Sequence, residues 1–329
     1  MSLLTVESLV KTFPVPHSRD TVKAVTDVSL SIAEGETLAL IGESGSGKTT
    51  VARCIVRLLA PDSGRIAFQG NDLLGLRGRK LKAVRRRIQM VFQDPGTSLH
   101  PRMTVEAIVR EPIELWGNER VGSGARIREL LEMVRLSRSV MRKYPHQLSA
   151  GQQQQVSIAR ALASDPELVI LDEPTSALDP NSRLEIINLL VNLQQTLGIS
   201  LLFISHDLTV VKSLSQRVAV MYLGKIVETA ATEAVFERPM HPYSRALIAS
   251  VFPLEPGRSR DTFRLKGEIP SSIDLPEGCF LRFRCPMAVS ACAVAHPPLE
   301  EVAPGRRSAC YRATEVPPPK RLPVGTREG

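Results

Sequence analysis

Apolar and polar positions divide the chain into strand-like and helix-like segments. Residues 4–10 and 21–32 alternate between the two kinds of position, which is typical of half-buried strands. Short apolar runs, which are typical of buried strands, occur at 37–41, 88–92, 168–171 and 200–204. From residue 168 onward, such strands alternate with segments of helical periodicity. This order predicts an α/β fold with a mainly parallel sheet.

Two stretches depart from that alternation. Residues between the strands at 88–92 and 168–171 have mainly helical patterns, which predicts an inserted helical subdomain over about 98–163. After about residue 238 the chain becomes rich in proline and carries four of its five cysteines. We therefore expect a main domain over 1–238 and a short, irregular C-terminal extension over 239–329.

Composition narrows the class of protein. The chain has 329 residues, 43% of them hydrophobic, so it can bury a sizeable core. Its apolar runs are far shorter than the roughly 20 residues that span a bilayer, and the N-terminus lacks the pattern of a signal peptide. A soluble cytosolic protein is the expectation.

The net charge of +8 permits anionic partners. Much of the excess lies between Arg77 and Arg87, where a solvated helix face is favoured over a footprint for lipid or nucleic acid. Few aromatic residues interleave with these charges, so a stacking platform for single-stranded nucleic acid is missing. We expect no nucleic-acid partner.

A glycine-rich segment connects the apolar run 37–41 to a helix-like stretch. Strand, glycine-rich turn and helix form the context that a phosphate-binding loop requires, because backbone N–H groups and the helix N-terminus then face the phosphates. Lys48 supplies a charge for the β- and γ-phosphates, and the Thr49 hydroxyl is a natural Mg²⁺ ligand. The segment that we expect to bind ATP comprises Gly42, Glu43, Ser44, Gly45, Ser46, Gly47, Lys48, Thr49 and Thr50.

Further polar residues follow the predicted strands. Gln93 comes after the run 88–92, and Asp172 and Glu173 end the run 168–171, where open α/β sheets hold their ligands. His206 follows the run 200–204 and precedes Asp207, a position that disfavours the alternative of a histidine satisfied in a loop. The sequence Leu-Ser-Ala-Gly-Gln at 148–152 opens a helix, with Ser149 placed as its cap.

Together, in this order, these elements resemble the ATPase subunits of ATP-binding cassette (ABC) transporters, over about the first 240 residues. The resemblance implies a P-loop NTPase fold with an N-terminal antiparallel β subdomain. It also implies that Asp172, Thr49 and Gln93 serve Mg²⁺, that Glu173 is the catalytic base, and that His206 contacts the γ-phosphate. Phe13 matches the position that stacks on adenine, and Asp179 matches a loop that crosses the dimer interface.

In this family two cassettes face each other head to tail. Ser149, Ala150, Gly151 and Gln152 would therefore complete the ATP site of a second cassette. Ala150 stands where glycine is usual, and Gln155 where arginine often lies. A left-handed backbone at Ala150 would cost roughly 1 kcal/mol, which would weaken the partner's site.

The extension resembles that of the peptide and nickel import branch. The resemblance rests on His-Pro-Tyr-Ser-Arg at 241–245 and on the segment 278–286, which carries Cys279 and Cys285. It implies a different ATPase chain as dimer partner, two membrane permease subunits and an extracytoplasmic substrate-binding protein. The chain would then lie on the cytoplasmic face of the membrane as a peripheral subunit that energises import of short peptides or a related solute.

Cys279, Cys285, Cys292 and Cys310 could hold a [4Fe-4S] cluster or Zn²⁺, although their spacing contains no C-x2-C pair. Four reduced thiols in a loop are the equal alternative. One other function stays open, that of an accessory ATPase of a soluble complex, such as one that cleaves phosphonates. A nucleic-acid repair or translation ATPase, suggested only by the positive charge, would carry two cassettes or long insertions, which this sequence lacks.

Overall fold

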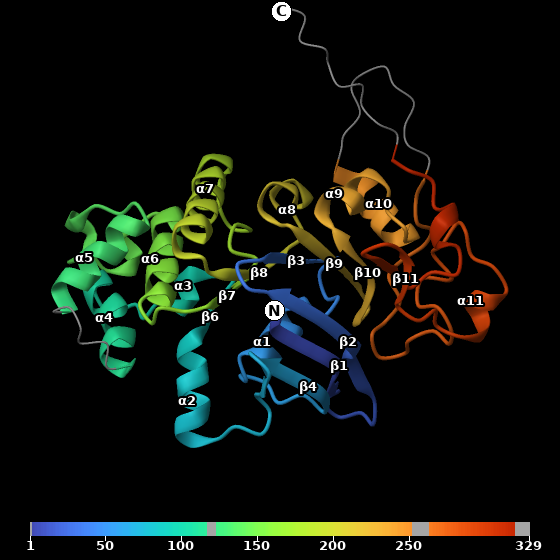
Figure 1. The fold of residues 1–329 in the computed structure, drawn as a ribbon, viewed down its shortest axis with the longest axis horizontal. Helices are drawn as coiled ribbons and strands as arrows, with labels where there is room; N and C mark the ends of the chain where they lie inside the picture. The colour runs from blue at the N-terminus through green and yellow to red at the C-terminus, as the bar shows by residue number, and fades with distance from the viewer. Residues whose placement is uncertain (1, 117–122, 252–262, 320–329) are drawn as a thin grey trace, which may run out of the picture.

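An eight-stranded sheet forms the centre of the molecule (Figure 1). The computed structural model describes residues 2–116, 123–251 and 263–319. The strands lie in the order β11-β12-β10-β9-β3-β8-β7-β6, and the five from β9 to β6 are parallel. Their bounds are β3 Thr37–Ile41, β6 Ile88–Val91, β7 Leu168–Asp172, β8 Ser200–Ser205, β9 Arg217–Tyr222, β10 Lys225–Ala231, β11 Glu300–Ala303 and β12 Arg306–Ser308. The predicted α/β class with a mainly parallel sheet is confirmed.

A second, antiparallel sheet lies against one face of the first. It has the order β2-β1-β4-β5, with bounds β1 Ser2–Pro14, β2 Thr21–Ala33, β4 Ser63–Phe68 and β5 Asn71–Asp72. Helix α1, Lys48–Ile55, lies between the two sheets and buries its apolar side there. Because strand side chains alternate between faces, Leu38 and Leu40 of β3 join this core while Ala39 and Ile41 join the core on the opposite face.

Helices cover that opposite face and extend beyond the end of the sheet (Figure 1). Among the described residues, no strand occurs between β6 and β7, as the expected helical insertion requires. The helices are α3 Pro95–Ser98, α4 Val105–Trp116, α5 Ser123–Met133, α6 Ala150–Leu162, α7 Pro180–Leu197, α8 Leu208–Leu214 and α9 Thr232–Glu237, with short 3₁₀ turns at Arg138–Val140 and Pro145–Gln147. The exact limits of the subdomain stay a prediction.

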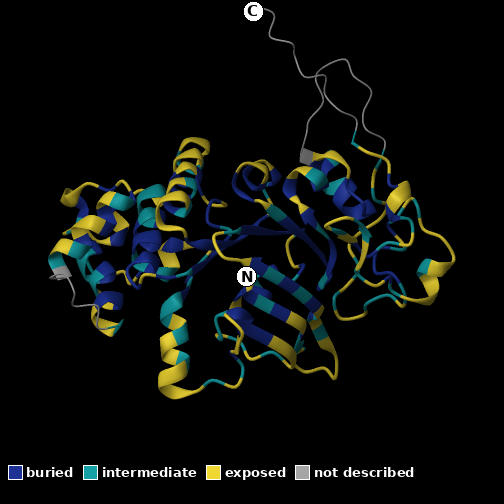
Figure 2. Ribbon diagram, in the orientation of Figure 1, coloured by how far each residue is buried: buried dark blue, intermediate teal, exposed yellow. Residues whose placement is uncertain are grey.

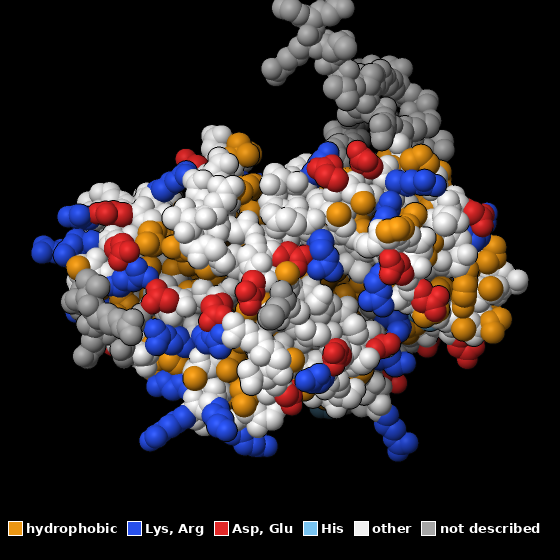
Figure 3. Space-filling model, viewed as in Figure 1, with side chains coloured by type: hydrophobic (Ala, Val, Ile, Leu, Met, Phe, Trp, Pro, Cys, Tyr) orange, Lys and Arg blue, Asp and Glu red, His pale blue; other side chains and the backbone are white. Residues whose placement is uncertain are grey.

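Helix α2, Gly78–Arg87, carries the basic cluster. None of its residues is buried (Figure 2), and Lys and Arg side chains project from the edge of the molecule below it (Figure 3). This exposure agrees with the solvated helix face expected from the sequence.

The extension is less irregular than expected. It contains α10 Pro242–Val251, α11 Ala291–Val294, a 3₁₀ turn at Ala313–Glu315, and the strands β11 and β12. Strand β12 pairs antiparallel with β10, with Glu228 opposite Ser308, so the extension widens the main sheet. The pairing joins segments that lie far apart in the sequence, and short segments of this kind do not predict a strand by themselves. Within the described ranges, no helix is long and apolar enough to cross a membrane.

Candidate nucleotide site

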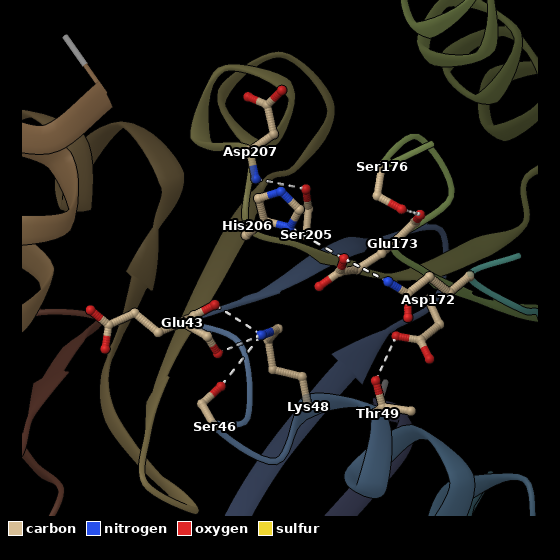
Figure 4. Close-up of polar contacts among 12 residues, drawn as sticks. Glu43, Ser46, Lys48, Thr49, Asp172, Glu173, Ser176, Ser205, His206 and Asp207 are labelled. Atoms are coloured by element: carbon tan, nitrogen blue, oxygen red, sulfur yellow. Dashed lines mark hydrogen bonds and ion pairs between the residues drawn. The ribbon is translucent and has the colours of Figure 1, made fainter. Parts of the chain in front are cut away.

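The phosphate loop lies between β3 and α1, at the carboxyl edge of the parallel strands. In the structure the Lys48 side chain is buried and turned back onto its own loop, as Figure 4 shows. Its ammonium donates to the backbone oxygens of Gly42 at 2.8 Å and Glu43 at 3.0 Å, and to the Ser46 hydroxyl at 3.4 Å. Burial lowers the pKa of Lys48, while the carboxylates of Glu173, Asp172 and Glu43 oppose the change. A phosphate group bound here would accept hydrogen bonds from the Lys48 ammonium and further offset the cost of burying its charge.

Two glycines in the loop are required by its surroundings. A Cβ atom on Gly42 would lie 2.1 Å from the Met221 carbonyl oxygen, and one on Gly47 would lie 2.1 Å from that of Ala24. Both glycines have positive φ, 154° and 103°, which disfavours other residues. The loop therefore packs directly between the backbone of β9 and that of β2, which fixes its position relative to the main sheet.

Asp172 and Thr49 form the oxygen-rich part of the site. The Thr49 hydroxyl donates to the Asp172 carboxylate at 3.0 Å. Asp172 is 1% exposed, and this burial raises its pKa. A hydroxyl and a carboxylate are ligands that Mg²⁺ prefers, and a cation there would offset the cost of burying the carboxylate. The residues therefore fit Mg²⁺ completed by water and phosphate oxygens.

Glu173 meets the two other predicted catalytic side chains. The Gln93 amide donates to Glu173 Oε2 at 3.2 Å, and His206 Nδ1 lies 3.2 Å from the same oxygen. Glu173 itself has φ of 47°, an uncommon value for a non-glycine residue, and its N–H donates to the Ile204 carbonyl of β8. This turn directs the Glu173 side chain toward His206 (Figure 4). Three residues separated by up to 113 positions in the chain are thereby brought together.

A cavity of about 440 Å³ lies against the phosphate loop. Gln93, Glu173 and His206 line its catalytic side, and Ser272 of the extension lines it as well. Phe13 does not line it, but pairs with Val22 of β2, which does. The loop contributes Ser44, Gly45, Gly47, Lys48, Thr49 and Thr50. Six of the nine predicted phosphate-loop residues therefore share one cavity with the three predicted catalytic residues.

Known proteins match the chain over most of its length. A family model described as "ABC transporter" matches residues 25–176, and one described as "Oligopeptide/dipeptide transporter, C-terminal region" matches residues 227–292. A "Probable peptide ABC transporter ATP-binding protein" of Sinorhizobium fredii is 47% identical over 319 residues, which cover 94% of this chain and 90% of that protein. This chain belongs to the ABC transporter ATPases. The resemblance drawn from the sequence is confirmed.

Other relatives of this ABC ATPase agree. The "Oligopeptide transport ATP-binding protein AppF" of Bacillus subtilis is 45% identical over 295 residues, with 88% of this chain and 89% of that protein covered. Among solved structures, a dimeric post-hydrolysis state of an ATP-binding cassette bound to ADP and Pi matches with a TM-score of 0.63 and 29% identity. That match covers 70% of this chain and 98% of the other. The P-loop NTPase fold and ATP hydrolysis follow from these relationships.

The segment Ser149–Gln152 of this ABC ATPase lies at the start of α6, not in its own cavity. The Ser149 hydroxyl accepts the Gln152 N–H at 3.2 Å, and the Gln152 side chain accepts the Ser149 N–H in return. Ala150 is the first residue of the helix and does not have positive φ, so the strain considered for a left-handed backbone does not arise. Asp179 is exposed and caps α7 by accepting the N–H groups of Asn181 and Ser182.

The four extension cysteines of the ABC ATPase share one neighbourhood. Burial raises the pKa of Cys279 to about 11 and that of Cys310 to about 12, and the charges of neighbouring cysteines add to both shifts. The Cys279 N–H donates to the Cys292 carbonyl at 2.8 Å. Within the described ranges, however, no three His, Cys, Asp or Glu side chains are arranged to hold a metal ion. The expected four-thiolate ligand set is therefore not formed as the side chains stand.

Sequence reasoning missed three residues of the extension that reach the nucleotide site. Ser272 lines the cavity, while Tyr243 and Arg284 contact Glu43 of the phosphate loop. Tyr243 lies in the His-Pro-Tyr-Ser-Arg motif, but nothing in the motif indicates a partner 200 residues earlier in the chain.

Proposed function

We propose that this ABC ATPase hydrolyses ATP to energise import of short peptides, or of a related solute, through a membrane permease. One observation carries the proposal: the cavity that joins Lys48 to Glu173 and His206 occurs in a chain whose C-terminal region matches the oligopeptide/dipeptide transporter family. The names of the relatives favour the same substrate class.

ATP would bind with its phosphates on the loop Gly42–Thr50. Lys48 would exchange its three loop acceptors for the β- and γ-phosphates, a change favoured because its ammonium is buried. Thr49, Asp172 and Gln93 would hold Mg²⁺, which neutralises developing phosphate charge when bound. Phe13 would stack on adenine from the end of β1, beside the cavity-lining Val22.

Hydrolysis would depend on the group around Glu173. Its carboxylate would orient and deprotonate the attacking water, and the contacts of Gln93 and His206 with Oε2, each 3.2 Å long, would hold that carboxylate in position. The exposed imidazole of His206 lies at the mouth of the cavity, where a γ-phosphate would extend beyond Lys48. Gln93 would report the state of that phosphate to the helical subdomain.

A second ATPase subunit would complete the site, and we propose that it is a different chain. Ser149 and Ala150 are exposed, and the backbone N–H groups at the start of α6 point outward from a helix N-terminus, which favours anions. Asp179 is also exposed. In a head-to-tail pair, residues 149–152 would contact the partner's γ-phosphate, with Asp179 at the interface between the two cassettes.

The permease subunits would dock in a groove of about 780 Å³ between the sheet core and the helical subdomain. Leu58 and Leu115 line it and are 55% and 54% exposed. Gln93 and Asp172 lie along the same groove, so its occupant would sense the nucleotide site directly. Two permease subunits and an extracytoplasmic binding protein would complete the importer, and this chain would then lie at the cytoplasmic face of the membrane.

We also propose a metal-binding role for the extension cysteines, with a [4Fe-4S] cluster as the leading candidate and Zn²⁺ as the alternative. The support is that burial, and then the charges of neighbouring cysteines, raise the pKa of Cys279, Cys285 and Cys310, because a bound cation would stabilise the thiolates. The side chains would have to turn to form the ligand set. Absence of both iron and zinc from anaerobically purified protein would reject this role.

Co-purification tests the importer against the soluble-complex alternative. Tagged chain, expressed in its own host and extracted in mild detergent, should retain two integral membrane subunits and a second ATP-binding chain. Recovery of soluble catalytic subunits with no membrane protein would favour the accessory ATPase instead.

A further inference from the structure

The extension contacts the phosphate loop through a buried tyrosine. Tyr243 of α10 is fully buried, and its hydroxyl accepts the Glu43 N–H at 2.8 Å. Burial raises the pKa of Tyr243, so the phenol keeps its proton and remains a neutral partner. The extension thereby satisfies a backbone donor at the start of the loop.

An arginine of the extension contacts the side chain of Glu43, whose backbone N–H is bound by Tyr243. Arg284 lies on the loop that carries Cys279 and Cys285, and its guanidinium is 3.4 Å from the Glu43 carboxylate and 3.4 Å from the Tyr222 hydroxyl. The rings of Tyr222 and Tyr243 pack at a centroid distance of 4.6 Å. Figure 4 shows the Glu43 carboxylate directed away from Lys48, so Arg284 contacts Glu43 on the side of the residue that faces away from this lysine.

The peptide group between Gly42 and Glu43 links these contacts to the phosphate-binding lysine. Its N–H donates to the Tyr243 hydroxyl, while its carbonyl, that of Gly42, accepts a hydrogen bond from Lys48 at 2.8 Å. Rotation of this peptide would change both the resting partner of Lys48 and the path of the loop. The extension also fixes the adjoining wall, because the Ser272 carbonyl accepts the Lys23 N–H of β2 at 2.9 Å and Ser272 lines the cavity.

We propose that Tyr243 and Arg284 are positioning residues for the nucleotide: they hold Glu43 and thereby keep the phosphate loop in its binding conformation. They do not touch ATP in this scheme. The C-terminal extension is then a part of the nucleotide site that sets ATP affinity. The proposal rests on the nucleotide site proposed above.

Tyr243→Phe removes the hydroxyl and keeps the ring. We expect the KM for ATP of the assembled complex to rise about ten-fold, the effect of losing one buried hydrogen bond, while kcat stays within about two-fold. Binding of trinitrophenyl-ATP to the purified chain should weaken by a similar factor. Tyr311→Phe is the matched control, because Tyr311 lies in the extension, is exposed, donates to the Ala295 carbonyl at 3.2 Å and does not line the nucleotide cavity.

Arg284 provides a second test that does not alter the core of α10. Arg284→Gln should weaken nucleotide binding and Arg284→Lys should restore part of it, whereas Arg284→Gln combined with Glu43→Gln should cost little more than either change alone. Arg282→Gln is the control on the same loop, where the guanidinium donates to the Ala293 carbonyl. Thermal unfolding separates positioning from stability, because a purely structural role would lower the melting temperature without the split between KM and kcat.

Lys48→Ala distinguishes a failure of the positioning role from a failure of the nucleotide site on which that role rests. If that variant still binds trinitrophenyl-ATP normally, the nucleotide site itself is misassigned. If Lys48→Ala abolishes binding while Tyr243→Phe and Arg284→Gln both bind like the wild type, the positioning role is wrong and the nucleotide site stands.

Discussion

Glu173 is held between an amide and an imidazole at a backbone turn with positive φ. Because Gln93 and His206 both contact Oε2, the other carboxylate oxygen is available to a water molecule. That the three side chains lie together was predictable from the sequence, since polar side chains that follow parallel strands gather at one edge of the sheet, whereas their catalytic roles rest on the family resemblance and stay a prediction. It could not predict the uncommon backbone conformation of Glu173, which depends on a hydrogen bond to Ile204 of the neighbouring strand.

Glu173→Gln should abolish turnover while ATP still binds. Glutamine keeps the shape and the acceptor for the Gln93 amide, but it cannot take a proton from water, and loss of a general base typically costs 10²–10⁴-fold in rate. ATP hydrolysis by the assembled complex and trinitrophenyl-ATP binding by the chain measure the two effects. Glu7→Gln, at an exposed position on β1, is the control. Normal hydrolysis by the Glu173 variant with its partner present would refute the assignment.

At the scale of elements, strand β10 connects the cassette to its extension. Its Glu228 is 1% exposed and accepts the Met240 N–H at 2.8 Å, while the guanidinium of Arg306 in β12 lies 3.7 Å from the Glu228 carboxylate. The sequence indicated neither β11 nor β12, because these segments of three or four residues become strands only through pairing, β12 with β10 and β11 with β12. By contrast, the parallel strands β3, β6, β7 and β8 were predictable, since each is an apolar run long enough to be recognised by itself.

Glu228 should make the protein less stable as pH rises. Burial raises its pKa to about 7, well above its ordinary value, so the folded state binds the proton more tightly than the unfolded state. Stability is therefore lost as pH increases from about 4.5 through 7, by an amount on the order of 3 kcal/mol. Glu228→Gln, which keeps an acceptor for Met240, should melt like the wild type at pH 5 and at a higher temperature at pH 8.

Thermal unfolding of both proteins across this pH range checks the expectation. Glu300→Gln, on the exposed edge of β11, provides a comparison in which one carboxylate is lost without removing a buried group. If the melting temperatures of wild type and Glu228→Gln changed with pH in the same way, the Glu228 carboxylate would not be the cause of the pH dependence.

At the scale of the whole molecule, the nucleotide site and the groove beside it are continuous. Gln93 lines both the cavity and the groove, and Asp172 lies along the groove while its carboxylate meets Thr49. The sequence predicted a helical insertion, yet the groove arises only from the way α4 and α6 stand beside α1 and β6, which no local pattern encodes. A partner seated there would sense a movement of the helical subdomain when ATP binds.

Leu115→Asp should therefore uncouple the chain from its permease. Leu115 is half exposed at the groove. A carboxylate at this position would lose its hydration when the permease docks, and such a replacement of an apolar anchor weakens the affinity of an interface by about ten-fold or more. We expect loss of the membrane subunits on co-purification and of permease-dependent ATPase activity, with trinitrophenyl-ATP binding unchanged because Leu115 does not line the nucleotide cavity. Val294→Asp, at an 83% exposed position on α11, introduces the same charge away from the groove. Equal retention of the permease by both variants would place the docking surface elsewhere on the molecule.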